Sequence, residues 1–372
     1  MKKMLASALS AVALSWIGGS AMAQAPTQQP ASMPNSIMYA PNHQHQWVDN
    51  GDCCDHGGAY GEVGFLLLKP RWDNNAAFIT RSFNAVNGGV NGTISSSTVT
   101  SFQPDFDWMP RVVLGFGSRD GIGFRTRWVQ GKWDDTQTSI DSIGSGIFVN
   151  PSQQISTASP LINPISTFGA PDAPASLLAQ SDLSVLTWDF ESTKEAKIAN
   201  LDLLMAGGVR YLHMSQNYNV FINTPGGQTF TDQLLVSGHN LNGLGPTVAL
   251  DGRLPIGGGL SIYSTGRVSG LFAKGKQTAF SAQAQPALVT GEVPTIIEGA
   301  YQERNAILTM TEIEVGGEWR SNMGRSEVYV QGGFVGQMLY GAGNSSRSGN
   351  FANESNCNLG LFGLAVSAGF RF

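Results

Sequence analysis

Charged residues are scarce in this sequence. Asp, Glu, Lys and Arg make up 13% of its 372 residues, about half of the roughly 25% that is usual in soluble domains. A soluble protein needs a charged exterior, whereas a barrel in a membrane keeps its charges in the lumen and the loops. This shortage, together with 46 glycines, favours a membrane protein. The net charge of −5 offers no basic surface, so nucleic acid is not an expected partner.

Long apolar runs are also absent. Beyond the N-terminal segment, no stretch of eighteen or more apolar residues occurs. A helix needs about 20 such residues to cross the roughly 30 Å hydrocarbon core of a bilayer. Spanning helices are therefore excluded, which leaves a transmembrane β-barrel or a soluble secreted β-protein.

Cysteine is rare, and the three cysteines are Cys53, Cys54 and Cys357. An odd number with two neighbours adjacent does not make a disulfide framework. Two of them belong to the only metal-like cluster of the sequence, which consists of His43, His45, Cys53, Cys54 and His56. Zinc or copper accepts such ligands, but the spacing fits no four-ligand pattern. We therefore expect a flexible tail with exposed thiols, and neither a metal nor a cofactor.

The N-terminus has the form of a secretory signal. Lys2 and Lys3 precede an apolar stretch over residues 4–17, and small residues follow up to Ala21 and Ala23. We predict a signal peptide over residues 1–23 and export to the outer membrane of a bacterial envelope. Residues 24–58 are rich in Pro, Gln, Asn and His and are predicted to be a disordered periplasmic tail. Residues 59–372 remain for the folded part.

Apolar and polar residues alternate in bursts from residue 60 onward. Ile122, Phe124 and Trp128, for example, alternate with Arg125 and Arg127. Period-2 alternation is typical of β-strands with two different faces. Soluble sandwich strands usually have about five or six residues, whereas a tilted strand needs ~9–11 to cross a membrane. The observed runs have the longer length.

We predict an all-β, antiparallel transmembrane β-barrel of about ten strands, within a range of 8–12. The predicted strands are residues 60–71, 104–118, 121–134, 183–194, 199–223, 229–254, 259–279, 303–320, 326–341 and 358–372. Short turns are expected near 118–121, 195–199, 255–258 and 321–325, and longer connections near 73–103, 134–182, 281–302 and 342–356. Because bacterial barrels have short periplasmic and long external connections, both chain ends are placed in the periplasm. The last strand is expected to pair with the strand near Tyr60.

The charged residues of these strands share one face, which would face the lumen. The candidate pore-lining residues are Asp105, Asp107, Arg111, Arg125, Arg127, Asp189, Glu191, Arg210, Arg253, Arg267, Glu312, Glu314, Glu318, Arg320 and Glu327, with Asp202, Asp251 and Arg371 on the same face. This face could form a polar channel or a salt-bridged, closed interior. Ten tilted strands close to a radius of roughly 10 Å, so only a narrow pore could remain.

Aromatic side chains near the strand ends suggest belts at the two membrane interfaces. The predicted outer belt contains Trp72, Trp133 and Tyr340, and the predicted periplasmic belt contains Trp319, Phe370 and Phe372. The strand histidines are His213 and His239, and neither has a recognisable Ser or Asp partner. A barrel enzyme would need a nucleophile and a base brought together, so no enzymatic activity is expected.

Four strand-like stretches resemble the pore-forming, Legionella-type major outer-membrane proteins. They are DFDWMPRVVLGFG (105–117), GGVRYLHM (207–214), NGLGPTVALDGRLPIGGGLSIYSTG (242–266) and FGLAVSAGFRF (362–372). The resemblance implies a barrel in the outer membrane and a pore function. The terminal strand is also similar to those that barrel assembly machinery recognises, so this machinery is an expected partner.

The leading hypothesis is therefore a porin-like channel for the passive diffusion of small hydrophilic solutes. Outer-membrane lipids and those solutes are the other expected partners. The alternative is a closed structural or surface-contact barrel without conductance, with residues 134–182 as its exposed working surface. A soluble β-sandwich would be extracted by salt or carbonate, whereas a barrel would need detergent.

Overall fold

The structure, a computed structural model, describes residues 58–73, 75–86, 89–118, 120–140, 152–157, 166–168, 176–223, 232–284, 295–324, 326–345 and 357–372. The predicted signal peptide, all but one residue of the predicted tail, and the His43–His56 cluster lie outside these residues. Among the described residues, no helix is long and apolar enough to cross a membrane.

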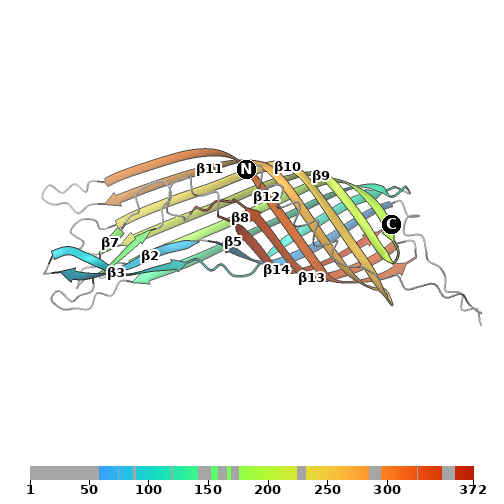
Figure 1. Cartoon of the computed structure of the whole chain (residues 1–372), viewed down its shortest axis with the longest axis horizontal. Coiled ribbons are helices and arrows are strands. Elements are labelled where there is room, and N and C mark those ends of the chain that lie inside the picture. The colour runs from blue at the N-terminus through green and yellow to red at the C-terminus, as the bar shows by residue number, and fades with distance from the viewer. Residues whose placement is uncertain are drawn as a thin grey trace, which may run out of the picture. The chain divides into compact units, whose positions relative to one another are not determined.

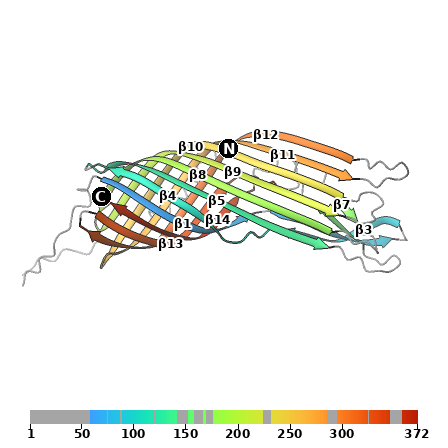
Figure 2. The same cartoon turned by 180° about the vertical axis from the view of Figure 1, so that it is seen from behind.

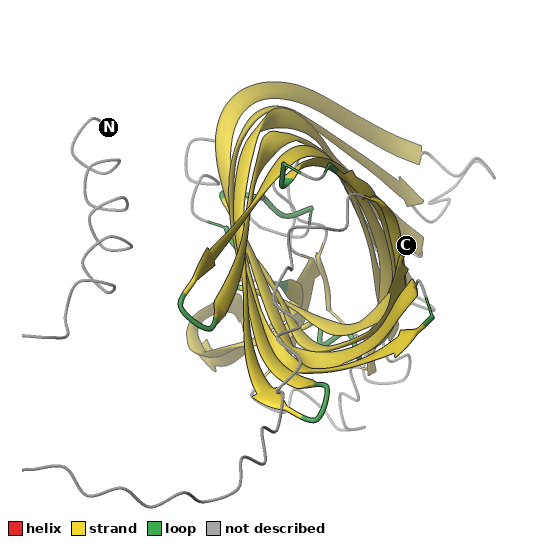
Figure 3. Cartoon of the chain, turned by 90° about the vertical axis from the view of Figure 1, so that its right-hand side faces the viewer, coloured by secondary structure: helices red, strands yellow, loops and turns green. Residues whose placement is uncertain are grey.

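Ten antiparallel strands form a closed barrel, as predicted, in the order β1-β14-β13-β12-β11-β10-β9-β8-β5-β4 (Figures 1 and 2). The strands are β1 (Gly58–Trp72), β4 (Asp107–Gly117), β5 (Ile122–Ile140), β8 (Ser176–Ile198), β9 (Leu201–Asn223), β10 (Asp232–Gly257), β11 (Leu260–Ala284), β12 (Thr295–Met323), β13 (Ser326–Tyr340) and β14 (Leu359–Arg371). The view along the barrel in Figure 3 shows the closed ring of strands.

The first and last strands close the ring. Tyr60 pairs with Arg371 and Trp72 with Leu359, and the backbone N–H of Phe372 donates to the carbonyl of Ala59 at 3.0 Å. This confirms the predicted closing role of the C-terminal strand. A barrel without free edges leaves no backbone group unpaired in lipid, which is the condition for crossing a membrane with strands.

The strands are staggered around the ring. A row of paired residues that starts at Ile307 of β12 passes through Phe272, Leu244 and each further strand, and returns to β12 at Trp319, twelve residues further along. Ten strands with this stagger tilt by about 40° and close to a radius of roughly 10 Å. The lumen is therefore narrow enough for opposing side chains to meet.

The two ends of the barrel differ in their connections. β4–β5, β8–β9, β10–β11 and β12–β13 are joined by short turns at the end that also holds the start of β1 and the end of β14. In the β10–β11 turn, Gly258 and Gly259 have φ of 64° and 80°, a conformation that glycine adopts without strain. Because short turns are periplasmic in bacterial barrels, we call this the periplasmic end and the opposite one the outer end.

Two of the predicted long loops contain strands, which corrects the loop assignment. β2 (Ala76–Val86) and β3 (Gly89–Ser101) lie within residues 73–103, and β6 (Ser152–Thr157) and β7 (Ser166–Phe168) lie within residues 134–182. They form a separate sheet in the order β3-β2-β6-β7, which lies toward the outer end (Figure 1). The sequences of these segments mix polar and apolar residues without a period of two, so the alternation that revealed the barrel strands is missing from them.

The outer face of the barrel is apolar over the part that lies nearer the periplasmic end. Phe65, Trp108, Val248, Ile313 and Phe334 are among the large apolar side chains that stay more than half exposed on this face. On β12 the apolar band extends from Ile307 to Trp319, a rise of roughly 30 Å for a tilted strand. This height suits the hydrocarbon core of a membrane. β8 to β12 continue well beyond the band, so the barrel projects from the membrane at its outer end.

Candidate functional site: the interior of the barrel

Buried ion pairs fill the interior nearer the periplasmic end, and Asp189 lies at their centre. Its carboxylate accepts hydrogen bonds from Arg210 at 2.6 and 2.8 Å, binds the guanidinium of Arg267, and lies 3.5 Å from Arg127. Asp189 and Arg210 are both 0% exposed. Buried charges are tolerated only where partners satisfy them, and one carboxylate here serves three arginines.

Strand register brings these charges together. Arg127 lies directly opposite Asp189 on the neighbouring strand, and Asp189 lies opposite Arg210. Arg267 of β11 is paired in the same way with Glu312 of β12. Opposite charges facing each other across neighbouring strands stabilise a sheet. The alternation that points these residues inward is the pattern recognised in the sequence.

Other pairs cross the lumen between strands that are not neighbours. Arg127 of β5 donates to Glu312 of β12 at 3.0 Å, and these strands are five places apart in a ring of ten. Arg111 of β4 likewise reaches Glu314 of β12 at 2.5 Å. Cross-lumen pairs of this kind fit the narrow radius, because Arg and Glu side chains together span most of the diameter.

We call this network the ionic layer. It consists of Glu62, Arg111, Arg125, Arg127, Asp189, Glu191, Arg210, Asp251, Arg267, Glu312 and Glu314. Sequence reasoning missed one member. Glu62 lies 3.1 Å from Arg111 and accepts a hydrogen bond from the hydroxyl of Tyr329. The alternation could have revealed it, because Glu62 lies on the opposite face of the first predicted strand from Val63.

The remaining candidate pore residues lie at the periplasmic mouth or at the beginning of β4. Glu318, buried at the mouth, pairs with Arg253 at 3.2 Å and with Arg320. Arg320 in turn pairs with Glu327.

Asp105 joins neither group, which corrects its prediction. β4 begins only at Asp107, so Asp105 precedes the strand, and its fully exposed side chain lies 3.9 Å from Lys69. Asp107, the first residue of β4, has the strand parity of the inward-facing Met109 and Arg111, and its exposed side chain accepts a hydrogen bond from the backbone N–H of Trp108.

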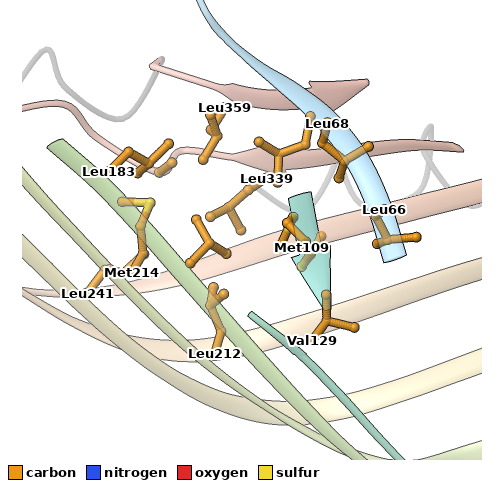
Figure 4. Close-up of a cluster of buried hydrophobic side chains, with 14 of the residues drawn as sticks. Leu66, Leu68, Met109, Val129, Leu183, Leu212, Met214, Leu241, Leu339 and Leu359 are labelled. Atoms are coloured by element: carbon orange, nitrogen blue, oxygen red, sulfur yellow. The ribbon is translucent and has the colours of Figure 1, made fainter. Parts of the chain in front are cut away.

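A layer of buried apolar side chains follows the ionic layer toward the outer end (Figure 4). This apolar layer consists of Leu66, Leu68, Met109, Val129, Trp133, Leu183, Val185, Leu212, Met214, Leu241, Leu271, Ala273, Leu308, Met310, Val335, Leu339, Ala342, Leu359, Leu361 and Ala365. Every barrel strand contributes to it, and Leu66, Leu212 and Leu271 are 0% exposed. The two layers meet where an Arg210 guanidinium nitrogen lies 3.4 Å from the sulfur of Met310.

A segment after β13 lies inside the barrel beyond the apolar layer. The backbone N–H of Ser345 donates to Gln216, and His239 is hydrogen-bonded through Nε2 to the carbonyl of Ala342 at 2.9 Å. Burial lowers the pKa of the His239 imidazole, the bond to Ala342 opposes this shift, and the charge of Arg304 adds to it. The histidine is therefore held neutral, with its proton on Nε2.

The predicted aromatic belts are partly corrected. Trp319, Tyr340, Phe370 and Phe372 are exposed on the outer face, the face on which a belt would lie. Trp133 is instead buried in the lumen, where its indole N–H donates to the carbonyl of Leu68 at 2.9 Å, and Trp72 packs against the apolar layer. Both have the strand parity of inward-facing residues.

Within the described ranges, no group of three or more His, Cys, Asp or Glu side chains is placed to hold a metal ion. The two strand histidines lie on opposite faces, since His213 is on the outside of β9 and bonds to Asn242 at 2.8 Å, whereas His239 is in the lumen.

Comparison with known proteins identifies the family of this chain. The profile of the family described as Legionella pneumophila major outer membrane protein precursor matches residues 60–372, so the chain belongs to this family of outer-membrane proteins. No curated protein matches.

Solved structures that resemble it include the outer membrane protease OmpT from Escherichia coli, with 9% identity, a TM-score of 0.35, and coverage of 85% of this chain and 96% of that one. A Pseudomonas aeruginosa FadL homologue matches with 10% identity, a TM-score of 0.22, and coverage of 86% and 90%. The toluene transporter TodX of P. putida matches with 8% identity, a TM-score of 0.21, and coverage of 84% and 89%.

Proposed function

We propose that this chain is a porin-like channel for the passive diffusion of small hydrophilic solutes, and that the conformation described here is its closed state. The observation that supports this proposal is the two-layered lumen, with rings of charge on the periplasmic side and an apolar layer above them. Channels use charged rings along an ion path, and apolar constrictions close such paths by excluding water.

The closed state follows from burial. Asp189, Glu191 and Arg210 of the ionic layer, and Leu212 and Leu271 of the apolar layer, are 0% exposed. These five side chains are therefore out of contact with solvent in this conformation. Passage of a solute requires side chains to move in both layers.

The apolar layer is expected to be the larger barrier. In an open, water-filled lumen, water would solvate the charged side chains of the ionic layer as they separate, which offsets the loss of their partners. Exposing apolar side chains to water costs about 25 cal/mol per Å². Among the described residues, no strand crosses the lumen within this layer, so shortening its side chains opens space without breaking the barrel ladder.

Planar-bilayer recording of the refolded full chain tests the proposal. We expect rare openings of small conductance from the native protein, and more frequent openings from Leu212→Ala and Leu271→Ala. Leu250→Ala, on the lipid-facing side of β10, is the matched control and should behave like the native protein. Absence of channels in all four proteins, beside a working porin control, would refute the proposal.

A surface-contact barrel without conductance is the second candidate. It is favoured by the long projection of β8 to β12 beyond the apolar band and by the extra sheet at the outer end. Removal of residues 152–168, which include β6 and β7, would test it. Loss of binding to cells or surfaces with unchanged permeability would support this role over the channel.

A further inference from the structure

The outer face of β9 to β12 carries a groove at the upper edge of the apolar band. The groove has a volume of about 460 Å³, and Tyr211, Asn242, Leu244, Phe272, Lys274 and Ile307 are among its lining residues. None of these side chains belongs to the lumen, since all of them point to the outside of the barrel. The groove is thus separate from the proposed channel.

Two neighbouring rows of paired residues build the groove. Leu244, Phe272 and Ile307 lie side by side in one row, and all three are more than half exposed. The next row toward the outer end is polar and contains His213, Asn242, Lys274 and Asn305. The outer face thus changes from apolar to polar between two neighbouring rows, and this change marks the level at which lipid chains end and headgroups begin.

Positive charge is concentrated at the polar edge. Lys274 and Lys276, about half exposed, both bind one carboxylate, with Nζ–Oε distances to Glu303 of 2.6 and 3.5 Å. Hydrogen bonds from Lys274 and the hydroxyl of Tyr301 lower the pKa of Glu303 to about 2, so this carboxylate stays ionised. Two cations share one anion, which leaves a net positive charge.

Hydrogen-bonding groups surround this charge. The side-chain carbonyl of Asn242 accepts from the hydroxyl of Tyr211 at 3.2 Å and lies 2.8 Å from Nδ1 of His213. This arrangement fixes the amide and turns its NH₂ group away from both partners. Amides, a hydroxyl and an imidazole next to lysines match a ligand that carries hydroxyl groups as well as phosphate.

We propose that this groove binds a phosphorylated glycolipid of the outer leaflet, of the lipid A class. Its phosphate would lie between Lys274 and Lys276 in place of Glu303, its sugar hydroxyls would face Asn242 and Asn305, and an acyl chain would lie along Leu244, Phe272 and Ile307. Below Phe272, a side chain added at Gly270 would meet nothing within 4 Å. The surface there is open for the chain to continue toward the membrane centre.

Titration of the folded full chain in detergent with bisphosphorylated lipid A, followed by native mass spectrometry, tests the proposal. The double variant Lys274→Gln/Lys276→Gln should bind at least tenfold more weakly, because each basic residue near an anionic lipid contributes roughly fivefold. Glu303→Gln should bind several-fold more tightly, because it frees both lysines. A variant that is merely misfolded cannot bind more tightly, and heat-modifiable gel migration checks folding.

Matched controls distinguish binding in this groove from a general attraction of anionic lipids to basic residues of the barrel. Lys132 is exposed on the outer face of β5, on another part of the barrel, and Lys132→Gln should leave the affinity unchanged. Dephosphorylated lipid A and phosphatidylglycerol should each bind at least tenfold more weakly than bisphosphorylated lipid A. An equal loss with Lys132→Gln, equal binding of either control lipid, or no gain with Glu303→Gln would overturn the proposal.

Discussion

The barrel interior is ionic toward the periplasmic end and apolar toward the outer end, and the same ten strands build both layers. In the ionic layer, each residue is fixed by partners on particular other strands, such as Arg127 by Asp189 and Glu312. In the apolar layer, side chains such as Leu212 and Leu271 are held only by packing. Charge thus specifies which strands face each other, whereas packing excludes water.

Removing the central carboxylate should have the largest effect. Asp189→Asn leaves Arg127, Arg210 and Arg267 without their shared anion, and an uncompensated buried charge costs roughly 3–5 kcal/mol. We expect a loss of that size in the free energy of unfolding, measured by urea titration of the folded protein in lipid. Asp182→Asn, on the exposed face of the same strand, is the control and should change stability by less than about 0.5 kcal/mol. Equal losses in both variants would contradict a special role for the network.

The apolar layer should respond through cavity formation. Leu212→Ala removes packing in a 0% exposed position and is expected to cost about 3 kcal/mol. Leu250→Ala faces lipid, whose chains fill the vacated space, so only the transfer contribution of about 2 kcal/mol is lost. The same urea titration checks the difference. A smaller loss in the lumen than on the lipid face would show that the apolar layer is loosely packed or hydrated.

The ten strands could be predicted because period-2 alternation is strong wherever one face meets lipid and the other the lumen. That same signal predicted the inward position of Arg111, Arg125 and Arg210. The lateral pairs, such as Arg127 with Asp189, follow from register, which depends on turn positions that were predicted only to within a few residues. The cross-lumen pair of Arg127 and Glu312 depends on the stagger of the closed ring, which no local pattern contains.

The errors have physical causes as well. The sequences of β2 and β6 do not alternate apolar with polar residues, so they predict a loop. The belt prediction for Trp72 and Trp133 rests on their distance along the strand, whereas strand parity decides which face a side chain occupies. Trp133 has the parity of Arg125 and Arg127 and therefore lies in the lumen.

This distinction between the two kinds of tryptophan is testable. Trp133→Phe removes the N–H that bonds to the buried carbonyl of Leu68, and the loss of this buried hydrogen bond should cost about 1–2 kcal/mol. Trp319→Phe, on the exposed outer face, should cost a few tenths of a kcal/mol, because the ring remains at the interface. Urea titration with tryptophan fluorescence measures both changes. Equal costs would argue against burial of Trp133.

The smallest expected effect concerns pH at the outer side of the apolar layer. His239 is neutral in the folded protein, and its pKa is lowered by burial, while Nδ1 is buried without a hydrogen-bond partner among the described residues. A group whose pKa is lowered on folding binds fewer protons in the folded state than in the unfolded state. Its contribution to the free energy of unfolding is therefore complete above the pKa of the unfolded chain, about 6.5, and is lost as pH falls below it. Acidification from pH 7.5 to 5 should therefore loosen the contact with Ala342, seen as faster hydrogen exchange in residues 341–345. His239→Gln keeps a donor for the Ala342 carbonyl but cannot be charged, so its exchange, corrected for the intrinsic pH dependence, should stay constant. An equal acid response in the variant would place the titrating group elsewhere.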